Sequence, residues 1–172
     1  MKLSDLNTSE YLSFYQTYLD NLPDENLIEI LESTKRKFAL FLASLKDDDL
    51  KKKYEPGKWT VAEVLQHILD TERIFQYRAL TLAREDSTKI PGFDQDAYVP
   101  SSKANQRDLQ SFIFEFDSVR NAGIALFQSF DDEMLKATGN VNGANFSVRA
   151  AGFISAGHQT HHLQLFKSRY VL

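Results

Sequence analysis

The chain has 172 residues, 42% of them hydrophobic and 26% charged, and its formal net charge is −4. These values are typical of one soluble globular domain, and we expect that domain to span residues 1–172. The small negative charge and the lack of a basic stripe argue against a nucleic-acid partner. Because the sequence contains no cysteine, disulfides, a cysteine nucleophile and thiolate metal ligands are excluded.

The first ten residues are polar and lack the apolar core of a signal peptide. No window approaches the roughly 20 consecutive apolar residues that a membrane-spanning helix needs. The absence of cysteine agrees with a reducing compartment. We therefore expect a cytoplasmic protein that has no membrane partner.

Apolar residues recur at three- and four-residue steps through most of the chain, which is the period of amphipathic helices. A first short helix is predicted over residues 4–22. Four long helices, separated by proline- and glycine-containing breakers, are predicted over residues 24–46, 59–86, 102–130 and 147–170. No convincing strand pattern is present. The sequence therefore predicts an all-α protein, a four-helix bundle with an extra short N-terminal helix.

Two connections between the predicted helices are distinctive. Residues 85–100 are predicted to form a long loop, and loops of this length in a compact domain are often functional. Phe93 and Tyr98 in this loop are candidates for lining a substrate pocket, although each could simply anchor the loop. Residues 139–145 predict a turn-rich connection before Ser147, the expected N-cap of the last helix.

Three of the four histidines lie within residues 158–162, on the last predicted helix. Residues i and i+4 of a helix share a face, so His158 and His162 can turn their imidazole nitrogens toward one metal ion, whereas His161 points partly aside. His67, on another predicted helix, would complete a three-histidine site if the fold brings it opposite this pair. The alternative is that these histidines fill a buried gap without binding a metal.

Three charged residues lie at helical spacing from these histidines. Glu63, one turn before His67, is a candidate general base, but it also occupies a capping-box position, which favours a structural role. Arg78 and Arg169 follow His67 and His158 by about three turns and are candidates for binding an anionic part of a substrate. Ion pairs with acidic neighbours on the surface are the simpler explanation of both arginines.

Several motifs together resemble one known family. They are Gly57-Lys58-Trp59-Thr60, His67-Ile68-Leu69-Asp70, Asn142-Gly143, Ser147-Val148-Arg149 and Gly157-His158-Gln159-Thr160-His161-His162. On these motifs, roughly residues 37–172 are similar to the DinB/YfiT-like superfamily of metal-binding four-helix bundles. One residue departs from the pattern, since Tyr98 stands where close relatives are expected to have tryptophan.

The resemblance implies an antiparallel bundle with up-down-down-up helix order. It also implies a divalent ion, nickel or zinc, bound by His67, His158 and His162, with no direct metal bond to His161. Members with assigned activity resemble thiol-dependent S-transferases and isomerases, and many others are labelled hydrolases without a demonstrated substrate. The implied partners are therefore small molecules, either a thiol or an electrophile.

The first predicted helix carries more aromatic side chains than one side of a short helix needs to bury: Tyr11, Phe14, Tyr15 and Tyr18. An excess of exposed apolar surface commonly marks an interface. Members of the resembling family also often pair. We therefore expect a homodimer.

The expected chemistry follows from the ligand set. Three neutral imidazoles leave a bound ion with its full charge, and such an ion lowers the pKa of a bound water or thiol. The chain offers no obvious nucleophile of its own, so we expect a metal-dependent enzyme that transfers an external low-molecular-weight thiol to a small electrophile. The alternatives are a metal-dependent hydrolase that uses water and a non-catalytic metal-binding bundle.

Overall fold

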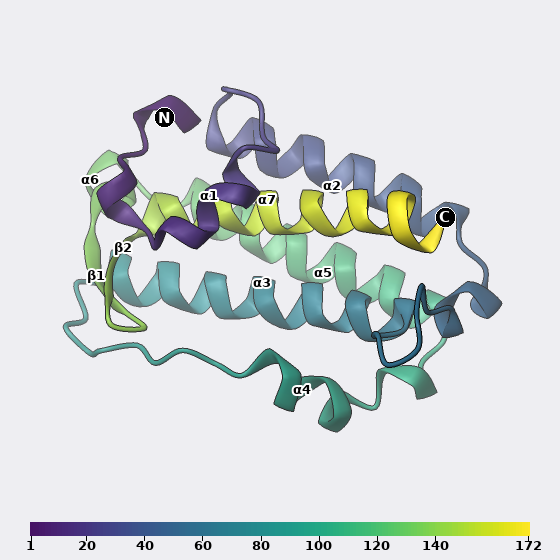
Figure 1. Ribbon diagram of the computed structural model, residues 1–172. Coiled ribbons are helices and arrows are strands. Elements are labelled where there is room, and N and C mark those ends of the chain that lie inside the picture. The colour runs from purple at the N-terminus through teal and green to yellow at the C-terminus, as the bar shows by residue number, and fades with distance from the viewer.

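The computed structural model describes residues 1–172. Its four long helices are α2 (Leu27–Ser44), α3 (Val61–Ala83), α5 (Leu109–Gln128) and α7 (Val148–Leu165). Both α7 and α5 pack against α2 and α3. In Figure 1, α2 and α7 run in one direction and α3 and α5 run in the opposite direction. The predicted all-α four-helix bundle with up-down-down-up order is therefore confirmed.

Shorter elements connect the long helices. They are α1 (Gln16–Leu19), α4 (Gln95–Ser102), α6 (Asp132–Lys136) and the strands β1 (Thr138–Val141) and β2 (Ala144–Ser147). Further 3-10 turns cover Leu3–Asp5, Thr8–Glu10, Ser13–Tyr15, Asp47–Lys51 and Ala104–Gln106, and a π-helical turn, Phe166–Tyr170, continues α7. None of the helices combines the length and the apolar character needed to cross a bilayer.

Polar side chains determine where two of the long helices begin. The Thr60 hydroxyl accepts a hydrogen bond from the Glu63 backbone N–H at 3.1 Å, and the Glu63 carboxylate accepts one from the Thr60 N–H at 2.7 Å. At the start of α7, the Ser147 hydroxyl accepts from the Ala150 N–H at 3.0 Å. These bonds satisfy N–H groups that a helix leaves unpaired in its first turn, as the sequence predicts.

The prediction of one helix over residues 4–22 is wrong. This segment forms three 3-10 turns and the four-residue helix α1. The carboxylates of Asp5 and Glu10 accept hydrogen bonds from the backbone N–H groups of Lys2 at 2.7 Å and Asn7 at 2.9 Å. Such local bonds compete with a continuous helix, so the chain forms separate turns instead.

The prediction of one loop over residues 85–100 is also wrong. Helix α4 begins inside it because the Asp94 carboxylate accepts from the N–H groups of Asp96 at 3.0 Å and Ala97 at 3.1 Å. Helix α5 begins at Leu109 rather than near residue 102, since the Asp108 carboxylate accepts from the Ser111 N–H at 2.7 Å. The two aspartate caps therefore decide the boundaries of α4 and α5.

Residues 138–147 form a β-hairpin rather than an irregular connection. The strands are antiparallel, with Thr138 opposite Ser147 and Val141 opposite Ala144. The turn residues Asn142 and Gly143 have φ angles of 53° and 81°, and two successive positive φ angles favour the Asn-Gly pair in a tight hairpin. That dipeptide was the signal for a hairpin in the sequence. The hairpin ends at Ser147 and so places the start of α7.

The buried interior consists of two apolar clusters at opposite ends of the bundle. Between them, buried polar side chains project from all four long helices. We call these eight residues the polar layer: Thr34, His67, Thr71, Glu72, Arg120, His158, Gln159 and His162. Buried polar groups need partners, so this layer constrains how the helices pack.

Arg120 on α5 is the centre of the polar layer and has no exposed surface. Its guanidinium donates to both carboxylate oxygens of Glu72 on α3, at 2.6 and 2.9 Å. It also donates to the Thr34 hydroxyl at 2.9 Å and the Leu31 carbonyl at 3.2 Å, both on α2. On α7, the Gln159 amide donates to the Thr34 carbonyl at 2.9 Å. The layer therefore links all four helices.

We expect Arg120→Met alone to lower the free energy of unfolding by about 3–5 kcal/mol, because it leaves the Glu72 carboxylate buried and unpaired. The double variant Arg120→Met/Glu72→Met should recover most of this loss, since two apolar side chains need no partner. Urea unfolding of the wild type, both single variants and the double variant measures this coupling. A double variant whose loss equals the sum of the single losses would contradict it.

A second ion pair attaches the N-terminal segment to the start of α7. The Glu10 carboxylate accepts from Arg149 Nε at 2.7 Å, and the two side chains are only 9% and 13% exposed. Burial alone would raise the pKa of Glu10. The hydrogen bonds from Arg149, Ser147 and the Asn7 backbone outweigh burial, so the pKa of Glu10 lies below its ordinary value of 4.5.

We expect Glu10→Gln to lower the free energy of unfolding by about 1–2 kcal/mol at pH 7. Because the pKa of Glu10 is depressed in the folded state, its contribution is complete above pH 4.5 and is lost as the pH falls below that value. Urea unfolding at pH 7, 5 and 3 measures the difference, with Glu32→Gln on the exposed side of α2 as control. A difference that is as large at pH 3 as at pH 7 would refute the assignment.

Candidate metal centre

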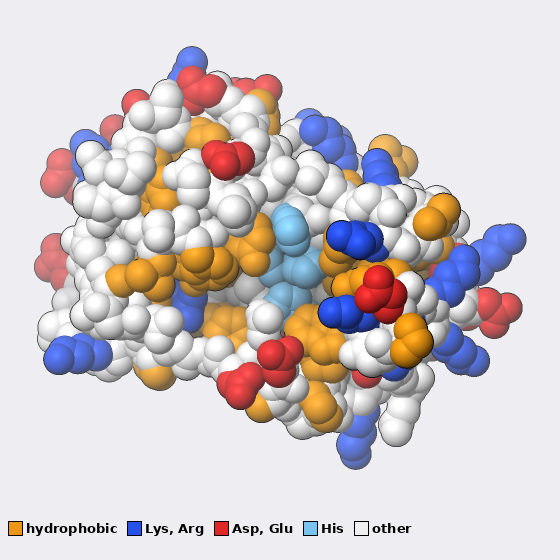
Figure 2. Space-filling model, in the orientation of Figure 1, with side chains coloured by type: hydrophobic (Ala, Val, Ile, Leu, Met, Phe, Trp, Pro, Cys, Tyr) orange, Lys and Arg blue, Asp and Glu red, His pale blue; other side chains and the backbone are white.

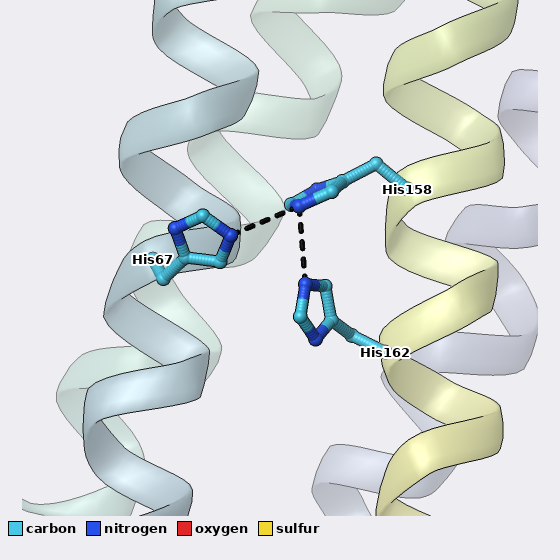
Figure 3. Close-up of side chains that lie close together, drawn as sticks. All are labelled: His67, His158 and His162. Carbon is cyan, nitrogen blue, oxygen red and sulfur yellow. Dashed lines mark hydrogen bonds between the residues drawn. The ribbon is translucent and has the colours of Figure 1, made fainter. Parts of the chain in front are cut away.

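Three histidines of the polar layer converge between α3 and α7. Figure 3 shows His67, from α3, facing His158 and His162, which project from successive turns of α7. Nε2 of His158 lies 3.0 Å from Nε2 of His67 and 3.1 Å from Nε2 of His162. The fold therefore brings together the three histidines that the helical spacing singles out.

These nitrogens cannot all satisfy one another by hydrogen bonding. A ring nitrogen of neutral imidazole offers either one N–H or one lone pair, so Nε2 of His158 can pair with one neighbour but not with both. Nδ1 of His162 is also buried without a hydrogen-bond partner. Three converging lone pairs suit a divalent ion, because nitrogens bound at about 2.0–2.1 Å lie roughly 3 Å apart. The donor set therefore fits a metal.

Burial keeps the three imidazoles neutral. It lowers the pKa of His67 to about 4 and holds the pKa values of His158 and His162 well below the ordinary 6.5. For His158 and His162, the other histidines of the cluster add to the effect of burial. Neutral imidazole is the form that binds metal ions, so the site is ready for one at pH 7.

The side of the cluster formed by α3 is supported by its neighbours. The Thr71 hydroxyl lies 3.4 Å from Nδ1 of His67, and the ring of Trp59 lies 5.2 Å from the His67 ring. The Tyr170 hydroxyl donates to the Trp59 carbonyl at 2.8 Å, which connects the end of the chain to this wall. These contacts restrict the orientation of the His67 ring.

On the α7 side, Tyr18 of α1 lies against the cluster. Its ring centroid is 5.2 Å from those of both His158 and His161. This contact requires a glycine at position 157, because a Cβ there would lie 2.5 Å from the Tyr18 carbonyl oxygen. Gly157 therefore allows the N-terminal segment to cover the site.

A pocket of about 320 Å³ adjoins the cluster. Its wall includes His162 together with Lys58, Trp59, Gln95, Asp96 and Tyr170. Figure 2 shows histidine side chains in a hollow on this face of the molecule, with hydrophobic side chains beside it. A small molecule can therefore approach the cluster from the side of His162.

Residues 30–166 match the family model of the DinB superfamily. The chain belongs to the DinB superfamily. A relative from Oceanobacillus iheyensis, provisionally named a metal-dependent hydrolase, is 26% identical over 140 residues, which cover 80% of this chain and 79% of the relative. The resemblance inferred from the motifs is therefore confirmed.

A solved structure shows the same fold. YfiT from Bacillus subtilis, described as a probable metal-dependent hydrolase with an unusual four-helix bundle topology, superposes with a TM-score of 0.68. The match covers 96% of this chain and 93% of YfiT at 18% sequence identity. At this identity the likeness establishes the arrangement of the helices and no more.

The other predicted site residues of this DinB protein lie in different places. Both carboxylate oxygens of Glu63 are engaged, one by the Thr60 N–H in the helix cap and the other by the Asn105 amide at 2.9 Å. The capping-box role is therefore the one that the structure shows. Arg169 is exposed on the π-helical turn, whereas Arg78 is buried on α3.

The candidates from the long connection do not line the pocket beside His162. Phe93 and Tyr98 contact each other, with ring centroids 5.5 Å apart, and Tyr98 is 47% exposed. Gln95 and Asp96, between them in the chain, line the pocket instead. No sequence signal marks these two residues, since their position depends on the cap that starts α4.

The aromatic residues behind the predicted homodimer are mostly covered by the chain itself. Tyr11 is buried, Tyr15 and Tyr18 are half-buried, and only Phe14, which is 55% exposed, faces outward. The homodimer stays a prediction.

Proposed function

We propose that this DinB-superfamily protein is a metal-dependent enzyme whose divalent ion is bound by His67, His158 and His162. The observation that carries the proposal is the convergence of three neutral, buried imidazole nitrogens beside an open pocket. The provisional name of the Oceanobacillus relative, a metal-dependent hydrolase, supports a metal requirement. Nickel and zinc are the ions we expect, because both suit imidazole ligands.

The ligand set favours catalysis over a purely structural metal. Structural zinc sites use four protein ligands, whereas catalytic sites keep three and leave a position open. No carboxylate joins the three histidines, and the pocket borders His162 directly. A divalent ion bound there would lower the pKa of the water or thiol that occupies its open position.

We infer that the nucleophile is an external low-molecular-weight thiol, which is transferred to a small electrophile. The Glu63 carboxylate is engaged in the helix cap, so it is not free to take a proton from water. A thiol, with an ordinary pKa near 8.5, needs less help to ionise than water, with a pKa of about 15.7. A carbon–sulfur bond then forms as the C–O bond of an epoxide or the π bond of an activated alkene breaks, and the proton lost by the thiol passes through solvent to the atom that receives the electron pair.

In this reaction the residues of the chain bind and orient the small molecules. The rings of Trp59 and Tyr18 pack against His67 and His158 and shield them from water on those sides. Lys58 and Asp96, on the pocket wall, can donate to and accept from polar groups of a bound molecule. The protein supplies position and environment rather than a nucleophile of its own.

Hydrolysis is the second candidate function. It is favoured by the names of both similar proteins, which describe metal-dependent hydrolases. The same three histidines would serve it, with water in place of the thiol. The two candidates differ in one observable property, which is whether turnover requires added thiol.

Purified protein should contain about one divalent ion per chain, because the three nitrogens form one site. We expect His67→Ala, His158→Ala and His162→Ala each to lower the affinity for zinc at least about tenfold, since each removes a ligand. His161→Ala is the matched control and should keep the ion. Elemental analysis and competitive zinc titration measure these effects, with circular dichroism to verify folding. Unchanged metal content in all three variants would refute the assignment.

The nucleophile can be identified by measuring turnover of an epoxide or an activated alkene with and without added thiol. Wild-type protein and His161→Ala should be active only with thiol, and His162→Ala should lose at least about a hundredfold in rate, because it removes a metal ligand. Hydrolysis without thiol that disappears in His162→Ala would establish the hydrolase instead. Equal rates in all samples would show that the protein does not act on these electrophiles.

A further inference from the structure

Arg78 on α3 is a buried cation without a hydrogen-bond or ion-pair partner, and its guanidinium lies only against the rings of Phe75 and Phe93. The residue is only 2% exposed, and its Nε and Nη1 atoms are buried without any hydrogen bond. None of the ion pairs of the structure involves it. Buried charges in proteins are nearly always paired, as Arg120 is with Glu72. An anion from outside the chain would supply what Arg78 lacks.

Arg78 lies on the same face of α3 as His67. Eleven residues, or about three turns, separate them, which places their backbones about 16 Å apart along the helix axis. The guanidinium carbon of Arg78 lies 5.2 Å from the ring centroid of Phe75, three residues earlier, so the side chain extends back toward His67. Its charged end is therefore on the order of 10 Å from the level of the histidines.

A series of aromatic rings connects the two positions. The Tyr18 ring lies 5.2 Å from His158, and the Tyr15 ring lies 6.3 Å from Tyr18 and 6.0 Å from Phe75. On another side of Arg78, the ring of Phe93 lies 5.9 Å from its guanidinium carbon. Aromatic side chains therefore lie along the stretch from the histidines to Arg78. Such a surface suits the uncharged middle of an elongated molecule.

We propose that Arg78 binds an anionic group, a carboxylate or a phosphate, of the small molecule on which the three-histidine site acts. This rests on the proposed function. A guanidinium donates two parallel hydrogen bonds to either group, which pairs the buried charge. The substrate class is therefore an elongated small molecule whose anionic end lies on the order of 10 Å from its reacting atom.

An arginine kept for stability would behave differently. Removing one partner of a satisfied ion pair destabilises a protein, but removing an unpaired buried charge does not. We expect Arg78→Met, which keeps an apolar stem, to have a melting temperature equal to or above that of the wild type. A clear drop in melting temperature would indicate a structural role and count against the proposal.

The binding test uses octanoate, octyl phosphate and octanol, which share one chain and differ in the end group. Isothermal titration of the protein as purified should show one of the anions binding at least about tenfold more tightly than octanol, and the tighter anion identifies the group. Arg78→Met should abolish this preference. Arg78→Lys keeps the positive charge but loses the planar guanidinium that donates two parallel hydrogen bonds. This variant should therefore keep only part of the preference for the anion.

Arg84→Met is the matched control. Arg84 lies six residues further along the chain, is exposed, and also has its guanidinium near an aromatic ring, 5.8 Å from Phe130. This variant loses the same charge and should keep the full preference for the anion. Equal loss in Arg84→Met and Arg78→Met would mean that net charge alone is responsible, which overturns the proposal.

His158→Ala separates this proposal from the metal assignment. A preference that is lost in Arg78→Met but kept in His158→Ala supports an anion site at Arg78, whatever the metal analysis shows. A preference that survives in Arg78→Met but disappears in His158→Ala means that the anion binds at the histidines. That result, or a wild type without any preference, would overturn the proposal.

Discussion

The buried ion pair between Arg120 and Glu72 is the interaction on which the arrangement of the histidines depends. A buried guanidinium must keep its hydrogen bonds, and those of Arg120 reach α3 through Glu72 and α2 through Thr34. Gln159, next to His158 in the chain, connects α7 to the same threonine. Any shift of one helix along another would leave one of these groups unpaired. The polar layer thus holds α3 and α7 at the register in which the histidine nitrogens meet.

The two buried arginines of the bundle illustrate different uses of charge. Arg120 is fully paired and links helices, whereas Arg78 has no hydrogen-bond or ion-pair partner within the chain and lies only against aromatic rings. An unpaired buried cation opposes folding, and proteins keep such groups mainly where binding needs them. Burial of the apolar clusters at both ends of the bundle stabilises the fold and offsets the free-energy cost of this unpaired charge.

The position of the site between α3 and α7 also explains how it can be both buried and accessible. Helix bundles build metal sites from facing helices, where the main chain needs no irregular segment to supply ligands. The N-terminal segment covers one side through Tyr18, at the contact that Gly157 permits. The pocket beside His162 leaves another side open, between the start of α3 and α4. Differences in these two covering segments would change which molecules enter, without changing the ligands.

Features that depend on neighbours within one or two helical turns could be predicted from the sequence. The apolar period predicted the four long helices, and the spacing of His158 and His162 placed them on one face, because a helix repeats every 3.6 residues. Thr60 and Ser147 were recognisable as caps for the same reason. Some local features were nevertheless misjudged: Asp94 begins a helix and Asn142-Gly143 forms a hairpin turn where only connections were predicted, and the Asp108 cap begins α5 later than predicted. Other features required the tertiary structure, because their partners are distant in the chain: Glu72 and Arg120 are 48 residues apart, and His67 and His158 are 91 apart. No local pattern reveals that one buried arginine meets a carboxylate and that the other, Arg78, meets none. Only the packing of α3 against its neighbours decides this.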